Sequence, residues 1–202
     1  PIYHDIPLLV ESFRTKSGIS YDHHHPDLAS AVEDFTASTY RTVPKWLTED
    51  IFGSELWKRL QAPQTKILDV GCGSAPGVLC LGAVFPHATC VKGIDPSHAA
   101  IACARQRLSA CPDPRLMVEQ KHTSDLIGQE HFTLATMWDV VHDLPCPLAV
   151  LREVLGLLEP GGVLLTYDPA VQSRLRDNLP HVGKMEFALS MNVCLSSCLA
   201  RD

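Results

Sequence analysis

The sequence lacks several features that mark well-defined protein classes. It has no apolar run of the roughly 18–20 residues that can cross a bilayer. It has no basic surplus, since 17 Lys and Arg residues stand against 23 Asp and Glu residues. The resulting net charge of −6 at pH 7 argues against a broad nucleic-acid-binding face. We therefore expect a cytoplasmic protein with neither a membrane nor a nucleic acid as its partner.

Metal-ligand patterns are scarce as well. The eight cysteines include no C-x-x-C pair, so the spacing typical of zinc and redox sites is missing. Their scatter indicates reduced, partly buried cysteines of an intracellular protein. The His run at residues 23–25 is flanked by Pro26 and Asp27, which favours a solvated loop. We therefore predict no metal site.

No internal repeat or low-complexity segment interrupts the chain, and 202 residues are enough for one domain with a substantial core. After a mostly helical start, predicted strands alternate with predicted helices. The strands are expected at 66–70, 89–94, 115–120, 132–140 and 163–168, and the helices at 76–85, 96–110 and 147–158, the last one closed by Pro-Gly-Gly at 160–162. This alternation predicts an α/β fold with a doubly wound, mostly parallel sheet and a site at the carboxyl ends of its strands. Residues 1–60 are expected to form an N-terminal helical cover, and residues 61–202 the binding domain.

The stretch "KILDVGCGSAPG" at 66–77 is the first candidate for binding a ligand. A short apolar strand ends there in a turn, where Gly71 and Gly73 let the backbone turn tightly and approach a ligand closely. Ser74 is expected to cap the following helix, and Pro76 suits its first turn. A strand, a glycine turn and a helix start together predict a nucleotide-binding edge.

Two common nucleotide patterns are absent from this turn. Pro76 stands where the dinucleotide fingerprint has its third glycine, and no Gly-Lys-Ser/Thr ending follows. Asp69, two residues before the first glycine, would repel a phosphate but attract an ammonium group. The stretch resembles motif I of the class I S-adenosylmethionine-dependent methyltransferases, with Ala75 where that family usually has a third glycine. The resemblance implies S-adenosylmethionine as cofactor, with Gly71 and Gly73 along its methionine part and Asp69 near its ammonium.

Two further positions are candidates for binding the cofactor. Asp95 lies 22 residues after Gly73, at the end of the second predicted strand, where a carboxylate can accept hydrogen bonds from both ribose hydroxyls. "DPS" is also a good helix N-cap sequence, and the same spacing would serve NAD. At the end of the third strand the family often has an acidic residue that meets adenine. Here His122, Thr123, Ser124 or a backbone N–H are the candidate adenine contacts, and a plain loop histidine is the alternative to a binding role for His122.

The stretch "WDVVHDLPCP" at 138–147 carries the candidate catalytic residues. Asp139 ends the fourth predicted strand, where the family places residues facing the methyl donor. His142 and Asp143 follow, and the segment is similar to the "HD" element of small-molecule O-methyltransferases. There the histidine can remove a hydroxyl proton while a carboxylate orients it. The alternative is a histidine that only begins a helix, because methyl transfer can need no more than positioning.

The resemblance extends along most of the chain, through "SGISY", "HDLPCP", "LEPGG", "LPHVG" and "FALSMNVCLSS". It points to a methyltransferase subgroup that usually carries an N-terminal winged-helix segment. That segment is absent before Pro1, and the 34 residues after Asp168 are too few for the last two strands of the usual sheet. We therefore expect a fragment or a shortened form.

The function implied by the resemblance is methyl transfer from S-adenosylmethionine to an oxygen or nitrogen of a small molecule. The alternative is a noncatalytic module that binds the cofactor or a partner. The oligomeric state stays open, with a homodimer among the alternatives.

Overall fold

A computed structural model describes residues 2–178 and 183–200. Within these ranges a five-stranded sheet has the order β3-β2-β1-β4-β5, and every neighbouring pair is parallel. The strands are β1 (Lys66–Val70), β2 (Cys90–Asp95), β3 (Leu116–Gln120), β4 (Phe132–Trp138) and β5 (Leu158–Tyr167). The prediction of an α/β fold with a doubly wound parallel sheet is confirmed.

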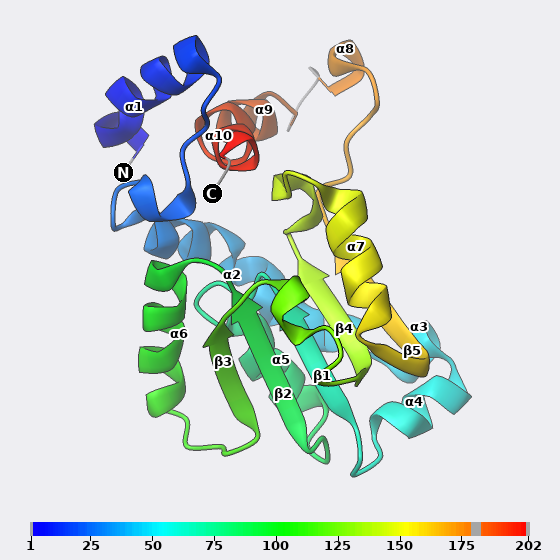
Figure 1. Ribbon diagram of the computed structural model, residues 1–202. Helices are drawn as coiled ribbons and strands as arrows, with labels where there is room; N and C mark the ends of the chain where they lie inside the picture. The colour runs from blue at the N-terminus through cyan, green and yellow to red at the C-terminus, as the bar shows by residue number, and fades with distance from the viewer. Residues whose placement is uncertain (1, 179–182, 201–202) are drawn as a thin grey trace.

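Helices flank the sheet and lie beyond the carboxyl ends of its strands (Figure 1). The α-helices are α1 (Ile2–Thr15), α2 (Leu28–Trp46), α3 (Glu49–Phe52), α4 (Ser54–Leu60), α5 (Pro76–Val84), α6 (His98–Ser109), α7 (Pro147–Gly156), α8 (Leu175–Asn178), α9 (Gly183–Asn192) and α10 (Cys194–Leu199). The short 3₁₀ helices are η1 (Tyr21–His23), η2 (Thr123–Leu126) and η3 (Val141–Asp143). None of these helices is long and apolar enough to cross a bilayer.

The two faces of the sheet pack against different helices, because successive side chains of a strand point to opposite faces. Ile67 of β1 belongs to the apolar cluster that includes residues of α2, α4, α5 and α6. Its neighbour Leu68 belongs to the cluster that includes residues of α7 and η2. The same alternation places Asp69 on the face covered by α5.

The N-terminal and C-terminal segments meet beyond the carboxyl ends of the strands, where α1, α9 and α10 lie in Figure 1. The backbone N–H of Ile19 donates to the carbonyl of Ser196 at 2.9 Å. Gly18 has φ +72°, and a Cβ at this position would lie 2.1 Å from the backbone nitrogen of Ala200. The predicted N-terminal helical cover is confirmed, while the domain boundary at residues 60 and 61 stays a prediction.

The start of β5 differs from the prediction. Pro-Gly-Gly at 160–162 was expected to close the preceding helix, but these residues lie inside β5, which begins at Leu158. The physical reason is a contact with Arg59, which lies 102 residues before Gly161 in the sequence. The guanidinium of Arg59 donates to the carbonyls of Gly161 at 2.7 Å and Pro160 at 3.0 Å. Gly161 has φ +75°, and the β4–β5 register shifts between Phe132, which pairs with Leu158, and Leu134, which pairs with Val163. Arg59 therefore supports the Pro-Gly-Gly segment as a bulge of β5.

The capping prediction at the glycine turn is also wrong. The N-cap of α5 is Ala75, with φ +69° and no side-chain cap, while Pro76 lies in the first turn as expected. The hydroxyl of Ser74 instead donates to the carboxylate of Glu33 on α2 at 2.7 Å. The turn is therefore tied to the N-terminal cover through Ser74.

The prediction of a solvated loop is wrong for the middle residue of the histidine run. The imidazole of His24 is buried, and its Nδ1 lies 3.0 Å from Oδ2 of Asp5, which is also buried. The backbone N–H of His25 donates to the same carboxylate at 3.2 Å. This buried pair fixes the segment after α1 against α1 itself.

Candidate active site

The glycine turn is pinned to the end of β2. The backbone N–H groups of Gly71 and Cys72 both donate to the carbonyl of Ile94, at 2.9 and 3.0 Å. Gly71 has φ +67°, and a Cβ there would lie 2.6 Å from Val140. At Gly73, with φ +53°, the position of a Cβ has nothing within 4 Å. The turn thus requires glycine at position 71, and it leaves open space beside Gly73 that a ligand can fill.

Asp95 is held beside this turn by two backbone N–H groups. Its Oδ2 accepts from Gly73 at 3.0 Å, and its Oδ1 accepts from Ser97 at 2.9 Å. The N-cap of α6 is Ser97, whose hydroxyl accepts from the N–H of Ala100 at 3.1 Å. Because a carboxylate oxygen can accept more than one hydrogen bond, each oxygen of Asp95 still has capacity for a hydroxyl. Burial raises the pKa of Asp95, and the two backbone hydrogen bonds oppose that shift.

Asp69 lies under the start of α5 rather than in the open turn. Its side chain is buried, and its Oδ1 accepts from the hydroxyl of Thr136 at 2.7 Å. A Cβ on Gly77 of α5 would lie 2.4 Å from its Oδ2. Burial raises the pKa of Asp69 to about 7, and the nearby charge of Asp95 adds to the shift. Trp138, buried on the same face, has an indole Nε1 without a hydrogen-bond partner among the described residues.

Two of the candidate adenine contacts lie at the end of β3 in different surroundings. His122 is the N-cap of η2, where Asp125 accepts from its backbone N–H at 2.9 Å. Its imidazole is close enough to Asp95 to favour the ionised carboxylate. Thr123 is buried, and its hydroxyl donates to Glu153 of α7. The structure therefore brings His122 near the ribose-binding candidate, whereas the hydroxyl of Thr123 is occupied elsewhere.

A second group of polar side chains surrounds His142 at the ends of β4 and β5. The Nδ1 of His142 lies 2.8 Å from Oδ1 of Asp168 and 3.8 Å from Oδ1 of Asp139. Its Nε2 lies 3.1 Å from Oδ1 of Asp143. Asp139 has φ +61°, an uncommon conformation for a residue with a side chain, and such outliers cluster at functional sites.

Asp168 is a member of this group that the sequence analysis missed. It follows β5 directly, and the β4–β5 register pairs Trp138 with Tyr167, so Asp139 and Asp168 leave neighbouring strand ends. The position of Asp168 after an apolar strand was a usable signal. It could only be interpreted once β5 was known to be the neighbour of β4.

Acidic groups control the protonation of His142. Burial alone would lower its pKa, but Asp143, Asp168 and Asp139 together raise it above its ordinary value. Burial also raises the pKa of Asp139 and of Asp143, while His142 opposes both shifts. Among the described residues no Lys or Arg forms an ion pair with these carboxylates. The site therefore combines three carboxyl groups with one imidazole that keeps its proton to a higher pH than a free histidine does.

The same side chains have the composition of a metal site. Ligand atoms of His142, Asp139 and Asp168 lie within 4.8 Å of one another, as do those of His142, Asp143 and Cys194. Burial, followed by the charge of Asp143, raises the pKa of the Cys194 thiol to about 12, which disfavours the thiolate that binds metals. The expectation of no metal site stays a prediction.

The N-terminal segment contributes Tyr21 to the same region, which the sequence analysis also missed. Burial raises the pKa of Tyr21, and the charges of Asp143 and Asp95 act in the same direction. The phenol is thus electrostatically coupled to both groups of candidate residues. This proximity could not be found from spacing, because Tyr21 precedes the glycine turn by 50 residues.

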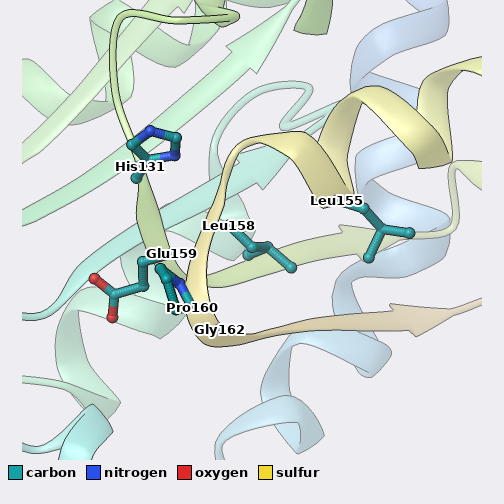
Figure 2. Close-up of a pocket in the computed structure, with 6 residues that line it drawn as sticks. All are labelled: His131, Leu155, Leu158, Glu159, Pro160 and Gly162. Atoms are coloured by element: carbon teal, nitrogen blue, oxygen red, sulfur yellow. The ribbon is translucent and has the colours of Figure 1, made fainter.

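A surface depression lies at the opposite end of the sheet. His131, Leu155, Leu158, Glu159, Pro160 and Gly162 line it, around the start of β5 (Figure 2). Because all five strands are parallel, this depression is separated from the carboxyl ends where Asp95 and His142 lie. It holds none of the predicted site residues.

The segment that carries these site residues is similar to parts of known proteins. Residues 68–164 match the family model described as Methyltransferase domain. The matched segment runs from β1 into β5 and contains the glycine turn, Asp95 and His142. A trans-aconitate 2-methyltransferase from Methylobacterium radiotolerans is 34% identical over 110 residues, which are 54% of this chain and 40% of that protein. The chain spans about two fifths of the length of the curated relatives that it matches.

Solved structures share the fold. An O-methyltransferase family protein from Burkholderia thailandensis has a TM-score of 0.68 at 15% identity, covering 94% of this chain and 57% of that one. The plantazolicin methyltransferase BpumL, solved with SAH and a pentazolic desmethylPZN analog, has a TM-score of 0.59 at 17% identity, covering 86% of this chain and 63% of that one. The Rossmann-like methyltransferase fold is therefore confirmed.

Proposed function

We propose that this chain binds S-adenosylmethionine and transfers its methyl group to an oxygen or nitrogen of a small molecule. The observation that carries the proposal is the position of Asp95. Its carboxylate lies next to the glycine turn, at the edge of a methyltransferase domain, with acceptor capacity left on both oxygens. Support also comes from BpumL, which shares the fold and was solved with SAH.

The residues around the turn suit this cofactor. The open space beside Gly73 accommodates a ligand close to the backbone, and Asp95 can receive the two hydroxyls of a ribose. Asp69 places a carboxyl group beneath the turn, and burial raises its pKa to about 7. An ammonium group beside it would lower that pKa and favour the ionised carboxylate. His122 faces the same edge as a candidate for the adenine end.

The chemistry requires little beyond alignment and one proton transfer. The bound cofactor supplies a sulfonium methyl group, and the acceptor must reach it in line. His142 is the proposed base for a hydroxyl or ammonium acceptor. Its two ring nitrogens lie beside carboxylates, Nδ1 at 2.8 Å from Asp168 and Nε2 at 3.1 Å from Asp143. Both carboxylates would stabilise the imidazolium that forms when His142 takes the proton.

A direct assay tests the proposal against its alternative, a noncatalytic binding module. The purified chain is incubated with S-adenosylmethionine labelled in the methyl group and a panel of phenols, catechols and amines. Transfer of label to an acceptor supports the enzyme. Tight binding of S-adenosylhomocysteine without transfer to any acceptor favours a module that binds the cofactor. Absence of binding of either ligand contradicts both of these and favours a module that binds a partner.

A further inference from the structure

Asp22 contacts the start of α6 from the N-terminal segment, 75 residues away in sequence. Its Oδ1 accepts from the hydroxyl of Ser97 at 2.5 Å, and its Oδ2 accepts from the N–H of His98 at 3.1 Å. A carboxylate in this position interacts favourably with the free N–H groups and the dipole of the helix. Burial would raise the pKa of Asp22, but these hydrogen bonds hold it below its ordinary value. The group is therefore ionised at neutral pH.

Ser97 connects Asp22 to the proposed ribose site. Its hydroxyl donates to Asp22, while its backbone N–H donates to Oδ1 of Asp95 at 2.9 Å. Oδ2 of Asp95 in turn accepts from the N–H of Gly73 at 3.0 Å. One continuous chain of hydrogen bonds thus runs from the N-terminal segment through Ser97 and Asp95 to the glycine turn.

The segment that carries Asp22 is itself fixed on both sides. The buried pair of Asp5 and His24, 3.0 Å apart, holds it against α1. The hydrogen bond from Ile19 to Ser196 holds it against α10. Ile19 and His24, which make these two contacts, lie within three residues of Asp22 in the sequence. The backbone that carries the Asp22 carboxylate to α6 is therefore fixed on both sides.

We propose that Asp22 is a positioning residue for the ribose site. It fixes Ser97 and the start of α6, so that the Asp95 carboxylate is held in the orientation that receives two hydroxyls. The expected benefit is preorganisation, because a carboxylate that is already oriented loses less conformational freedom on binding. The ligand in this proposal rests on the proposed function, whereas the hydrogen-bond chain exists in the free protein.

The test compares Asp22→Ala with Asp27→Ala in the full chain. Asp27 is five residues further along, and its side chain is 74% exposed, so it is a matched control. Calorimetry measures the affinity of each protein for S-adenosylhomocysteine and for its 2′-deoxyribose analogue. We expect Asp22→Ala to weaken binding of S-adenosylhomocysteine about tenfold and to reduce its preference over the deoxy analogue. A role confined to general stability would weaken both ligands equally, and that result would overturn the proposal.

Two further experiments apply if the variant does not fold or if the unaltered chain does not bind the ligand. If Asp22→Ala does not fold, Asp22→Asn takes its place, because it keeps the size and one acceptor, and it should show a smaller loss in the same direction. If the unaltered chain does not bind S-adenosylhomocysteine, the proposed function fails. Amide hydrogen exchange of Gly73 and Ser97 in the free proteins then decides the positioning role. Faster exchange in the Asp22 variant than in the Asp27 variant supports it, and equal exchange overturns it.

Discussion

Replacing Asp69 with Asn tests whether a buried carboxylate under the glycine turn makes the stability of this protein depend on pH. The side chain is buried and accepts a hydrogen bond from Thr136 at 2.7 Å. Asn has nearly the same shape, and its carbonyl oxygen can accept the same bond. The substitution therefore removes the ionisable group while leaving the packing under α5 almost unchanged.

The magnitude follows from the shifted pKa of Asp69, which burial raises from 3.8 to about 7. A raised pKa means that the folded state binds the proton more tightly than the unfolded chain. The stability that the protonated group contributes is complete below pH 3.8 and is lost as the pH rises to about 7. The full shift corresponds to about 4 kcal/mol at 1.36 kcal/mol per pKa unit, and roughly 2–3 kcal/mol of it is lost between about pH 5 and 8.

Thermal unfolding of the ligand-free proteins at several pH values between about 5 and 8 measures the effect. The Tm difference between the Asp69→Asn variant and the unaltered chain should grow in favour of the variant as the pH rises. It should be roughly 5–10 °C larger at pH 8 than at pH 5. The control is Asp34→Asn, because Asp34 is exposed on α2 and its substitution should leave the pH dependence unchanged. A Tm difference between the Asp69 variant and the unaltered chain that stays constant from pH 5 to 8 would refute the reasoning.

The remaining predictions concern the proposed base and the contact between the terminal segments. His142→Gln should keep the affinity for S-adenosylhomocysteine but lower turnover roughly 10²–10⁴-fold, and a variant with unchanged turnover on a hydroxyl acceptor would rule out the base. Because nearby carboxylates raise the pKa of His142 above 6.5, activity of the unaltered enzyme should rise with pH through a pKa above that value, and the variant should lose this limb. Gly18→Ala should lower the free energy of unfolding by about 1–3 kcal/mol through backbone strain alone. The clash of its Cβ, which would lie 2.1 Å from the backbone nitrogen of Ala200, should add a further loss. Its control is Gly128→Ala, which has a similar φ of +74° but an open Cβ position, and equal losses in chemical denaturation would contradict the importance of the Ala200 contact.

The parts of the fold that local signals determine were predictable. The strand before the glycine turn was placed at Lys66–Val70, as observed, because an apolar run meets a breaker cluster there. Pro76 marked the first turn of α5 for a similar local reason. By contrast, the start of β5 depends on the contact between Arg59 and Gly161. No window around Gly161 contains that information.

In the candidate site, too, some residues could be predicted from local sequence signals and others could not. Asp95 could be selected because it ends an apolar strand 22 residues after Gly73. His142 could be selected because its segment is similar to the "HD" element of small-molecule O-methyltransferases. Asp168 could not be joined to His142 until the β4–β5 pairing was known. Asp22 meets α6 only because the N-terminal segment crosses the carboxyl ends of the strands. Contacts of this kind are set by tertiary packing, which overrides the local tendency of such polar segments to remain in solvent.

The central claim, that this chain is built to bind S-adenosylmethionine through the glycine turn and Asp95, is tested most directly by calorimetric titration with S-adenosylhomocysteine. We predict saturable binding to the unaltered chain and no comparable binding of NAD. Asp95→Ala should weaken the binding of S-adenosylhomocysteine by roughly 1.5–3 kcal/mol, the range for hydrogen bonds to charged groups. Absence of binding, preference for NAD, or an unchanged affinity in the Asp95 variant would contradict the claim.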